Sequence, residues 1–306
     1  GGHIHSASSS MVVHSKGSSR LVWREQEPCF PAESELASTT GTSMFDGVSS
    51  TSGGSVACVA SLSDKVFRYF DWDSAESIAC PTDLDVYYAT ANTSKFTSCS
   101  DKGVSLGSGT ILRGSTATKG GAVSAILCTV DMKNTSITSS TATTGDGGAV
   151  LISFGSKLNV DQNTKFQQNA AEKGAGGAVS CQECSSMAFS RGTVFRSNVA
   201  REGGAVYLAS PIDSVSSEGS WFIDNVAQEK NGGAINSLDG NWNSTGDRFE
   251  NNAALAGSGG ALSSFGSVIH LDATTTCSKN RAPRGGGGCL IWEPYAVDLD
   301  DDKWKN

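Results

Sequence analysis

Gly203-Gly204-Ala205-Val206 is the stretch that decides the fold, because the chain repeats it at a nearly constant interval. The same pattern recurs at Gly120–Val123, Gly147–Val150, Gly176–Val179, Gly232–Ile235 and Gly259–Leu262, and as Gly-Gly-Cys-Leu at Gly287–Leu290. The first glycines are separated by 27, 29, 27, 29, 27 and 28 residues. A period of this length and constancy marks a solenoid, in which each repeat is one supersecondary unit stacked on the previous one.

A second phrase, phenylalanine followed three positions later by asparagine, keeps a fixed register with the first. It precedes a Gly-Gly pair by eight or ten residues at four places: Phe166 with Asn169, Phe195 with Asn198, Phe222 with Asn225, and Phe249 with Asn252. The same step reaches three looser copies: Leu112 with Ser115, Ile137 with Ser140, and Cys277 with Asn280. The apolar position therefore persists, while the asparagine becomes serine toward the N-terminus. Phe45, eight residues before Gly53-Gly54, indicates a further coil upstream.

The composition of the repeats predicts strands rather than helices. The repeats are rich in Gly, Ser, Thr and Asn, which are poor helix-interior residues. Apolar residues alternate in short runs, as at Val206 and Leu208 and at Leu158 and Val160, which is typical of strands. Three short strands per coil of 27–29 residues, each paired with its counterpart one coil away, predict an all-β chain. The expected fold is a right-handed parallel β-helix with N- and C-terminal caps.

Each residue type in the repeat has a mechanical reason, so we interpret both motifs as structural. Glycine supplies backbone angles that are closed to other residues at a sharp corner, and the alanine after it fits a crowded position. The four phenylalanines are expected to form one internal column. The asparagines are expected to stack as a ladder, each side-chain amide bonding the turn of the next coil.

The repeat divides the chain into a regular stack with irregular ends. Residues 1–44 lack the repeat and are expected to cap the first coil, whose open end would expose unpaired strand edges. We assign residues 45–111 to irregular first coils with an insertion, 112–292 to the regular β-helix and 293–306 to a C-terminal cap or tail.

Taken together, the two motifs resemble the repeat signature of the chlamydial polymorphic membrane proteins. Similar repeats occur in large extracellular proteins of protists and algae. The resemblance covers about residues 112–292 and implies a β-helical passenger domain of a surface adhesin. It carries over no catalytic residue, because no position of the two motifs is catalytic in that family.

Composition disfavours two classes of partner. The chain has 306 residues and a net charge of −8, without a stripe of Lys and Arg, which argues against nucleic acid. It contains no run of about 18 apolar residues, so no membrane-spanning segment is expected.

Nine cysteines and three sequons predict a secreted protein, outside the cell or at its surface. The glycosylation candidates are Asn92, Asn134 and Asn243, each in a Ser/Thr-rich stretch that we interpret as a loop. The disulfide candidates are Cys58, Cys80, Cys99, Cys128, Cys181, Cys184, Cys277 and Cys289, which leaves Cys29 single. Cys99 and Cys128 lie one coil apart, and Cys181 and Cys184 are close enough for a local bridge. With one C-x-x-C spacing, no metal site is predicted, and no cofactor.

Two functions from different classes remain open. The favoured one is a non-enzymatic extracellular β-helix, either a surface adhesin or a structural unit of a surface layer, sheath or filament. Its expected partners are further copies of itself, other extracellular structural proteins, or a host or matrix glycan or protein.

The alternative function is a polysaccharide lyase or hydrolase of β-helix type, which needs clustered carboxylates on neighbouring coils. The positions predicted to point outward after Gly-Gly are Ser124, Leu151, Ser180, Tyr207, Asn236 and Ser263. That row offers no carboxylate pair. Arg196, Asp224 and Glu250 fall in successive F-x-x-N turns, and we interpret them as single solvated charges. No catalytic residue is therefore predicted.

Overall fold

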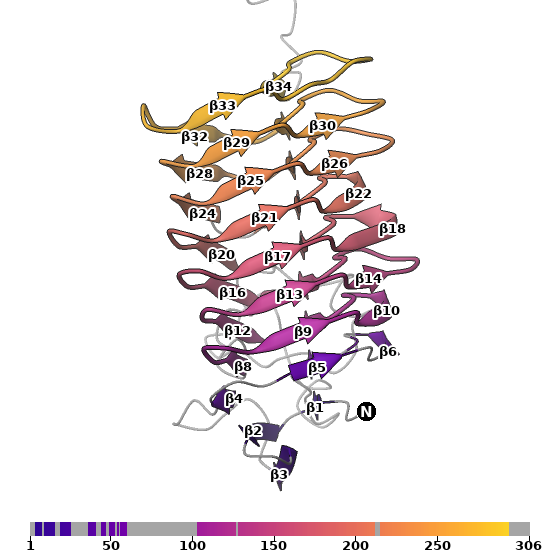
Figure 1. Cartoon of the computed structure of the whole chain (residues 1–306), viewed down its shortest axis with the longest axis vertical. Helices are drawn as coiled ribbons and strands as arrows, with labels where there is room; N and C mark the ends of the chain where they lie inside the picture. The colour runs from indigo at the N-terminus through magenta and orange to yellow at the C-terminus, as the bar shows by residue number, and fades with distance from the viewer. Residues whose placement is uncertain are drawn as a thin grey trace, which may run out of the picture.

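The computed structural model describes residues 4–7, 9–15, 19–25, 36–40, 44–46, 49–52, 54, 56–59, 103–126, 128–211 and 215–293. Side chains are described at Gly54 and Val56 and in residues 104–126, 128–211 and 215–293. In this part of the chain every regular element is a strand, and the strands stack into four sheets along the long axis of the molecule (Figure 1). The predicted parallel β-helix is confirmed.

Each sheet collects the equivalent strand of successive coils. Sheet 1 follows the Gly-Gly turns and contains β1 (Ile4–Ala7), β7 (Val56–Val59), β11 (Val123–Ile126), β15 (Val150–Ser153), β19 (Val179–Gln182), β23 (Val206–Ala209), β27 (Ile235–Leu238), β31 (Leu262–Phe265) and β34 (Leu290–Glu293). Sheet 2 contains β3 (Ser19–Glu25), β2 (Ser9–Ser15), β4 (Leu36–Thr40), β8 (Gly103–Leu106), β12 (Thr129–Met132), β16 (Lys157–Val160), β20 (Ser186–Phe189), β24 (Val215–Glu218), β28 (Trp242–Thr245) and β32 (Ile269–Leu271).

The other two sheets carry the second motif and the strand that follows it. Sheet 3 contains β5 (Met44–Asp46), β9 (Ile111–Arg113), β13 (Ser136–Thr138), β17 (Lys165–Gln167), β21 (Val194–Arg196), β25 (Trp221–Ile223), β29 (Arg248–Glu250) and β33 (Thr276–Ser278). Sheet 4 contains β6 (Ser49–Ser52), β10 (Thr116–Lys119), β14 (Thr141–Ala142), β18 (Ala170–Ala175), β22 (Val199–Glu202), β26 (Val226–Ala227) and β30 (Ala253–Ala254). Sheet 4 adds a fourth short strand per coil to the three predicted ones.

Pairing is parallel in every described ladder except the N-terminal hairpin, where β2 and β3 run antiparallel. Equivalent residues face each other one coil apart, so that Val206 lies opposite Ile235. The coil predicted upstream is in register as well, because Phe45 pairs with Leu112 and Val56 pairs with Val123. The N-terminal strands β1 and β4 extend the stack by pairing with β7 and β8.

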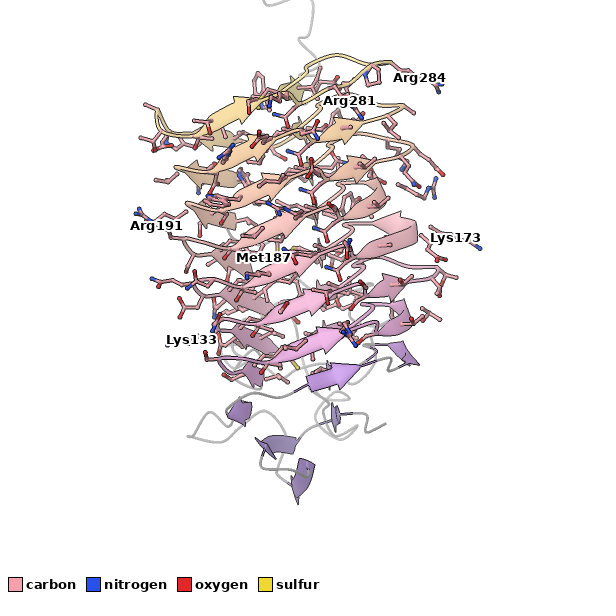
Figure 2. The ribbon with its side chains drawn as sticks, viewed as in Figure 1. Lys133, Lys173, Met187, Arg191, Arg281 and Arg284 are labelled. Atoms are coloured by element: carbon pink, nitrogen blue, oxygen red, sulfur yellow. A yellow bond between two sulfur atoms is a disulfide. The ribbon has the colours of Figure 1, made fainter. Side chains whose placement is uncertain are left out.

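The core contains the predicted column of phenylalanines. The rings of Phe166, Phe195, Phe222 and Phe249 are fully buried and stack with centroid distances of 4.9, 4.7 and 4.8 Å. Their planes differ by less than 10°, because each occupies the same position of its strand. Figure 2 shows the buried Met187 inside the stack, while Lys133, Lys173, Arg191 and Arg284 project from its sides.

The asparagines form the predicted ladder. The side-chain Nδ2 of Asn198 donates to Oδ1 of Asn225 at 3.0 Å and to the carbonyl of Phe166 at 3.0 Å. The same Asn225 Oδ1 also accepts the backbone N–H of Asn198. This pattern repeats from Asn169 to Asn280, so each turn is bonded to the next coil through a buried amide.

The two glycines of each corner are required for different reasons. The first has a positive φ, as at Gly203 with 56°, which L side chains rarely adopt. At the second, a Cβ on Gly204 would lie 2.2 Å from the carbonyl oxygen of Gly233 and 2.6 Å from the backbone of Val226. The strand of sheet 4 passes so closely over this glycine that no side chain fits.

Candidate functional site

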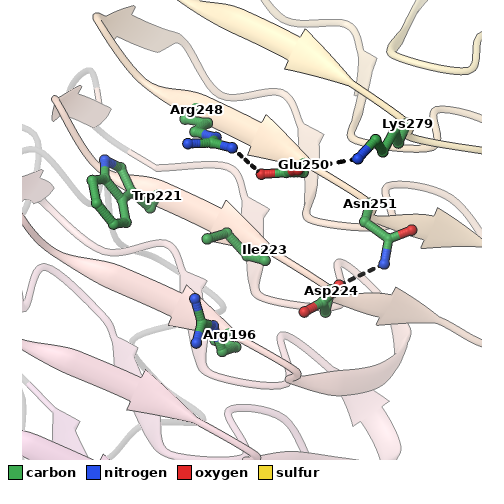
Figure 3. Close-up of a pocket in the computed structure, with 8 residues that line it drawn as sticks. All are labelled: Arg196, Trp221, Ile223, Asp224, Arg248, Glu250, Asn251 and Lys279. Atoms are coloured by element: carbon green, nitrogen blue, oxygen red, sulfur yellow. Dashed lines mark hydrogen bonds and ion pairs between the residues drawn. The ribbon is translucent and has the colours of Figure 1, made fainter.

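A polar groove lies on the outer face of sheet 3, over the phenylalanine column (Figure 3). Its volume is about 420 Å³, and its walls are formed by Arg196, Trp221, Ile223, Asp224, Arg248, Glu250, Asn251 and Lys279. The groove arises because successive side chains of a strand point to opposite faces of the sheet. The middle residue of β25, Phe222, is buried, so the flanking Trp221 and Ile223 face outward. The repeat that stacks the core therefore also positions the groove.

The lining residues form columns along the axis. Trp221 pairs in register with Arg248 on the next coil, and Ile223 lies between Arg196 and Glu250. A third column comes from the residue after each strand, which has a positive φ: 58° at Asp224, 55° at Asn251 and 56° at Lys279. Within that column Asn251 Nδ2 donates to Asp224 Oδ1 at 2.5 Å.

The charges in the groove are unequally partnered. Glu250 forms ion pairs with both Arg248 and Lys279, and its oxygen lies 3.7 Å from the lysine Nζ. Arg196 has no ion pair or side-chain hydrogen bond to any other described residue. With three cations and two carboxylates, the groove has an excess of positive charge on a chain whose net charge is −8.

Trp221 is the large apolar side chain of the groove, and 46% of its surface is exposed. Its indole N–H donates no hydrogen bond to any other described residue. An exposed aromatic face beside charged groups is a common feature of binding surfaces, because the ring offers a large rigid contact area.

The interpretation of Arg196, Asp224 and Glu250 as single solvated charges is wrong for Glu250, which forms two ion pairs, and for Asp224, which accepts a hydrogen bond from Asn251, while Arg196 is exposed and unpaired within the described part of the chain. The three lie in successive coils, and the coil spacing brings them into one groove with Trp221 and Arg248. The available signal was the pair of residues that flanks each motif phenylalanine, because those residues must face outward when the phenylalanine is buried.

A second polar cluster lies at the Gly-Gly turns. The Asp146 carboxylate accepts the Ala175 backbone N–H at 2.6 Å and a hydrogen bond from Gln182. Two coils further on, Glu202 accepts hydrogen bonds from Lys230 Nζ at 2.8 Å and Asn236 Nδ2 at 2.9 Å. These carboxylates were not predicted, because each stands at an irregular position before a Gly-Gly pair.

Burial dominates the electrostatics of this cluster. It raises the pKa of the Asp146 carboxyl above its usual value, and the charge of Glu202 adds to the rise. Burial, together with Glu202 and Asp146, raises the pKa of Tyr207 to about 12. Tyr207 is therefore a neutral phenol at physiological pH.

The row predicted to point outward after Gly-Gly is not a solvent-exposed surface. Ser124, Ser180 and Asn236 are each at most 1% exposed, and Tyr207 is half-buried. The Gly-Gly turn folds over this row: a Cβ on Gly120 would lie 3.0 Å from the Ser124 Cβ. The side chains of this row that were expected to point outward are therefore covered by the turns.

Replacing Asp146 with asparagine tests this electrostatic assignment. A carboxyl whose pKa is raised in the folded state stabilises the fold below its unfolded pKa, and that contribution is lost as the pH rises through the folded value. Asp146→Asn should therefore improve its stability relative to the parent as the pH rises from about 3 to 7. Urea unfolding midpoints across this range measure the difference, and a constant difference would contradict the assignment.

The structure contains disulfides within single coils. Cys181 is bonded to Cys184 and Cys277 to Cys289. Cys128 is disulfide-bonded and fully buried. Cys29, Cys80 and Cys99 lie outside the described residues, as does the side chain of Cys58, so their pairing stays a prediction.

The sequons differ in their surroundings. Asn134 lies on an exposed turn after β12, and its Nδ2 donates to Ser108 Oγ at 3.0 Å. Asn243 lies within strand β28 and is half-buried, so the expectation of a loop is wrong there. Asn92 lies outside the described residues. Glycosylation at all three stays a prediction.

Among the described side chains, no three His, Cys, Asp or Glu residues are grouped to hold a metal ion. The described part of the chain also has no helix with the length and apolar character needed to cross a membrane. Comparison of the chain with protein-family models, with curated proteins and with solved structures yields no match. The likeness to the chlamydial repeat stays a prediction from the two motifs.

Proposed function

We propose that this chain is a non-enzymatic extracellular β-helix protein that serves as a surface adhesin. The observation that carries the proposal is the groove on sheet 3, which displays an exposed tryptophan and an unpartnered arginine on a rigid stack of strands. Binding sites are often built on such a rigid scaffold, because little conformational freedom is lost when the ligand binds.

The second version of the proposal, a structural unit of a layer or filament, is favoured by the last two coils. Phe265 in β31, Val268 just before β32 and Trp292 in β34 belong to the last two coils and are 43%, 64% and 54% exposed. Exposed apolar side chains at the end of a stack suit association with another copy or another extracellular protein.

An enzymatic function has one specific observation in its favour, the Asp146 and Glu202 carboxylates. A carboxyl with a raised pKa near a second carboxylate is the arrangement of a glycoside hydrolase. Here both groups are already engaged, Asp146 by Ala175 and Gln182 and Glu202 by Lys230 and Asn236. We therefore assign them to stabilising the turns.

One set of assays separates these functions. Fluorescently labelled protein should be retained on cells or matrix, and acidic polysaccharides should stay intact in its presence. Polysaccharide cleavage that is lost in both Asp146→Asn and Glu202→Gln would establish the enzyme instead. Periodic filaments or sheets in native samples, without retention on cells, would support the structural version.

The extracellular location predicts a particular thiol count. Of nine cysteines, Cys128, Cys181, Cys184, Cys277 and Cys289 are already bonded in the described part of the chain. If the others pair as expected, Cys29 is left, and titration under denaturing conditions should find about one free thiol. Nine free thiols in protein from its native source would contradict secretion through an oxidising compartment.

A further inference from the structure

We propose that the groove on sheet 3 binds an acidic polysaccharide, with the Trp221 indole stacked on a sugar ring and the Arg196 guanidinium bonded to a carboxylate or sulfate of the same chain. This ligand class rests on the adhesive function proposed above and makes it specific. Three features of the groove support it: the tryptophan, the distribution of charge and the spacing of the coils.

The tryptophan suits a sugar better than an apolar ligand. Pyranose rings present a face of C–H groups and an edge of hydroxyls, so they need a flat apolar surface with polar groups beside it. Trp221 supplies the surface, and the Asp224 carboxylate and Asn251 amide, joined by their hydrogen bond, supply acceptors and donors across the groove, beyond the Ile223 column. An isolated aromatic side chain in such surroundings is too small a patch for an apolar partner.

The charges select an acidic sugar over a neutral one. Arg248 and Lys279 share the single carboxylate of Glu250, so each is incompletely neutralised. Arg196 is left with no charged partner among the described residues. A guanidinium offers a planar fork of donors that matches a carboxylate or sulfate, and an exposed arginine needs little desolvation to bind one.

The spacing of the groove suits a polymer that lies along the axis. Arg196, Trp221 and Arg248 come from β21, β25 and β29, which are consecutive strands of sheet 3 (Figure 3). Consecutive strands lie about 4.8 Å apart, which is close to the length of one pyranose unit. Arg248 lies in register with Trp221 on the next coil, whereas Arg196 on the preceding coil lies opposite Ile223, two residues further along the strand. A sugar stacked on Trp221 therefore has one arginine in line on the next coil and one displaced diagonally on the preceding coil.

Isothermal titration calorimetry, which measures the affinity of the intact protein for oligosaccharides of defined length, tests the proposal. The acidic probes are a heparin hexasaccharide and hexagalacturonate, and the neutral probe is cellohexaose. We expect saturable binding of at least one acidic probe, weakened by added salt, and no binding of cellohexaose. Arg196→Gln and Trp221→Ala should each weaken binding at least tenfold. Arg196→Lys should weaken it less, because it keeps the charge and loses the fork.

The matched control is Arg191→Gln, which removes an exposed arginine that pairs with Glu218 outside the groove. It should change affinity less than twofold. The arginine variants should keep the melting temperature of the parent, because the side chains of Arg191 and Arg196 are exposed. Trp221 is 46% exposed, and if Trp221→Ala unfolds, Arg196→Gln alone decides. Equal affinity in the parent and Arg196→Gln, or preference for cellohexaose, would overturn the proposal.

The outcomes also separate this proposal from the adhesive function. If cells retain the parent and both groove variants equally and no acidic probe binds, the ligand class is wrong while adhesion stands. If the acidic probes bind at the groove but no cell or matrix retains the protein, the site is established and the adhesive function is wrong.

Discussion

Phe222→Ala should lower the free energy of unfolding by about 3–5 kcal/mol, because it removes a fully buried ring and leaves a cavity in the core. The loss is expected at the upper part of this range. Phe222 stacks on both Phe195 and Phe249, and parallel coils held by backbone hydrogen bonds cannot close on the gap. Chemical denaturation followed by circular dichroism measures the change.

Val268→Ala is the control for this substitution. Val268 is 64% exposed, so the same kind of truncation should change stability by no more than about 0.5 kcal/mol. A midpoint for Phe222→Ala that matches the parent would show that the column does not hold the coils together.

Asn225→Ala should lower the free energy of unfolding by a similar amount, on the order of 3–5 kcal/mol, for a different reason. The Asn225 Oδ1 accepts both the backbone N–H and the side-chain Nδ2 of Asn198, and its own amide donates to the Phe195 carbonyl. Alanine leaves these groups buried without this partner, at about 1–3 kcal/mol each.

Asn159→Ala serves as the comparison, because the exposed side chain of Asn159 donates a single hydrogen bond to Asp131. It should be nearly neutral by the same denaturation assay. A loss for Asn225→Ala no larger than the loss for Asn159→Ala would mean that water replaces the ladder.

The sequence predicts the fold well because the fold acts on every coil alike. A glycine at the second corner position is required wherever a strand of sheet 4 crosses it, and a phenylalanine ring fits wherever the interior of the coil is wide. The same residue types therefore recur in every coil. Sheet 4 was missed because strands such as β14 and β26 have two residues each, too few to show alternation.

The groove could not be predicted in the same way, because outward positions are free of that constraint. The position of Trp221 is lysine in β17, valine in β21, arginine in β29 and threonine in β33. The repeat pattern of the sequence does not identify which of these residues has a function. Asp146 and Glu202 were not predicted to interact, because the residue at the same position of the coil between them is Ala175. The interaction of the two carboxylates depends on side chains that extend past this alanine.

The asparagine ladder gives the rod an electrical direction. Four of the amides, from Asn169 to Asn252, donate through Nδ2 to the oxygen of the next asparagine toward the C-terminus, and all five oxygens accept from the coil on the N-terminal side. Dipoles aligned in a buried chain add and polarise one another. The two ends of the ladder are therefore chemically different: it begins with the Ser140 N–H as a donor and ends with the Asn280 amide, whose Nδ2 donates back to the Phe249 carbonyl.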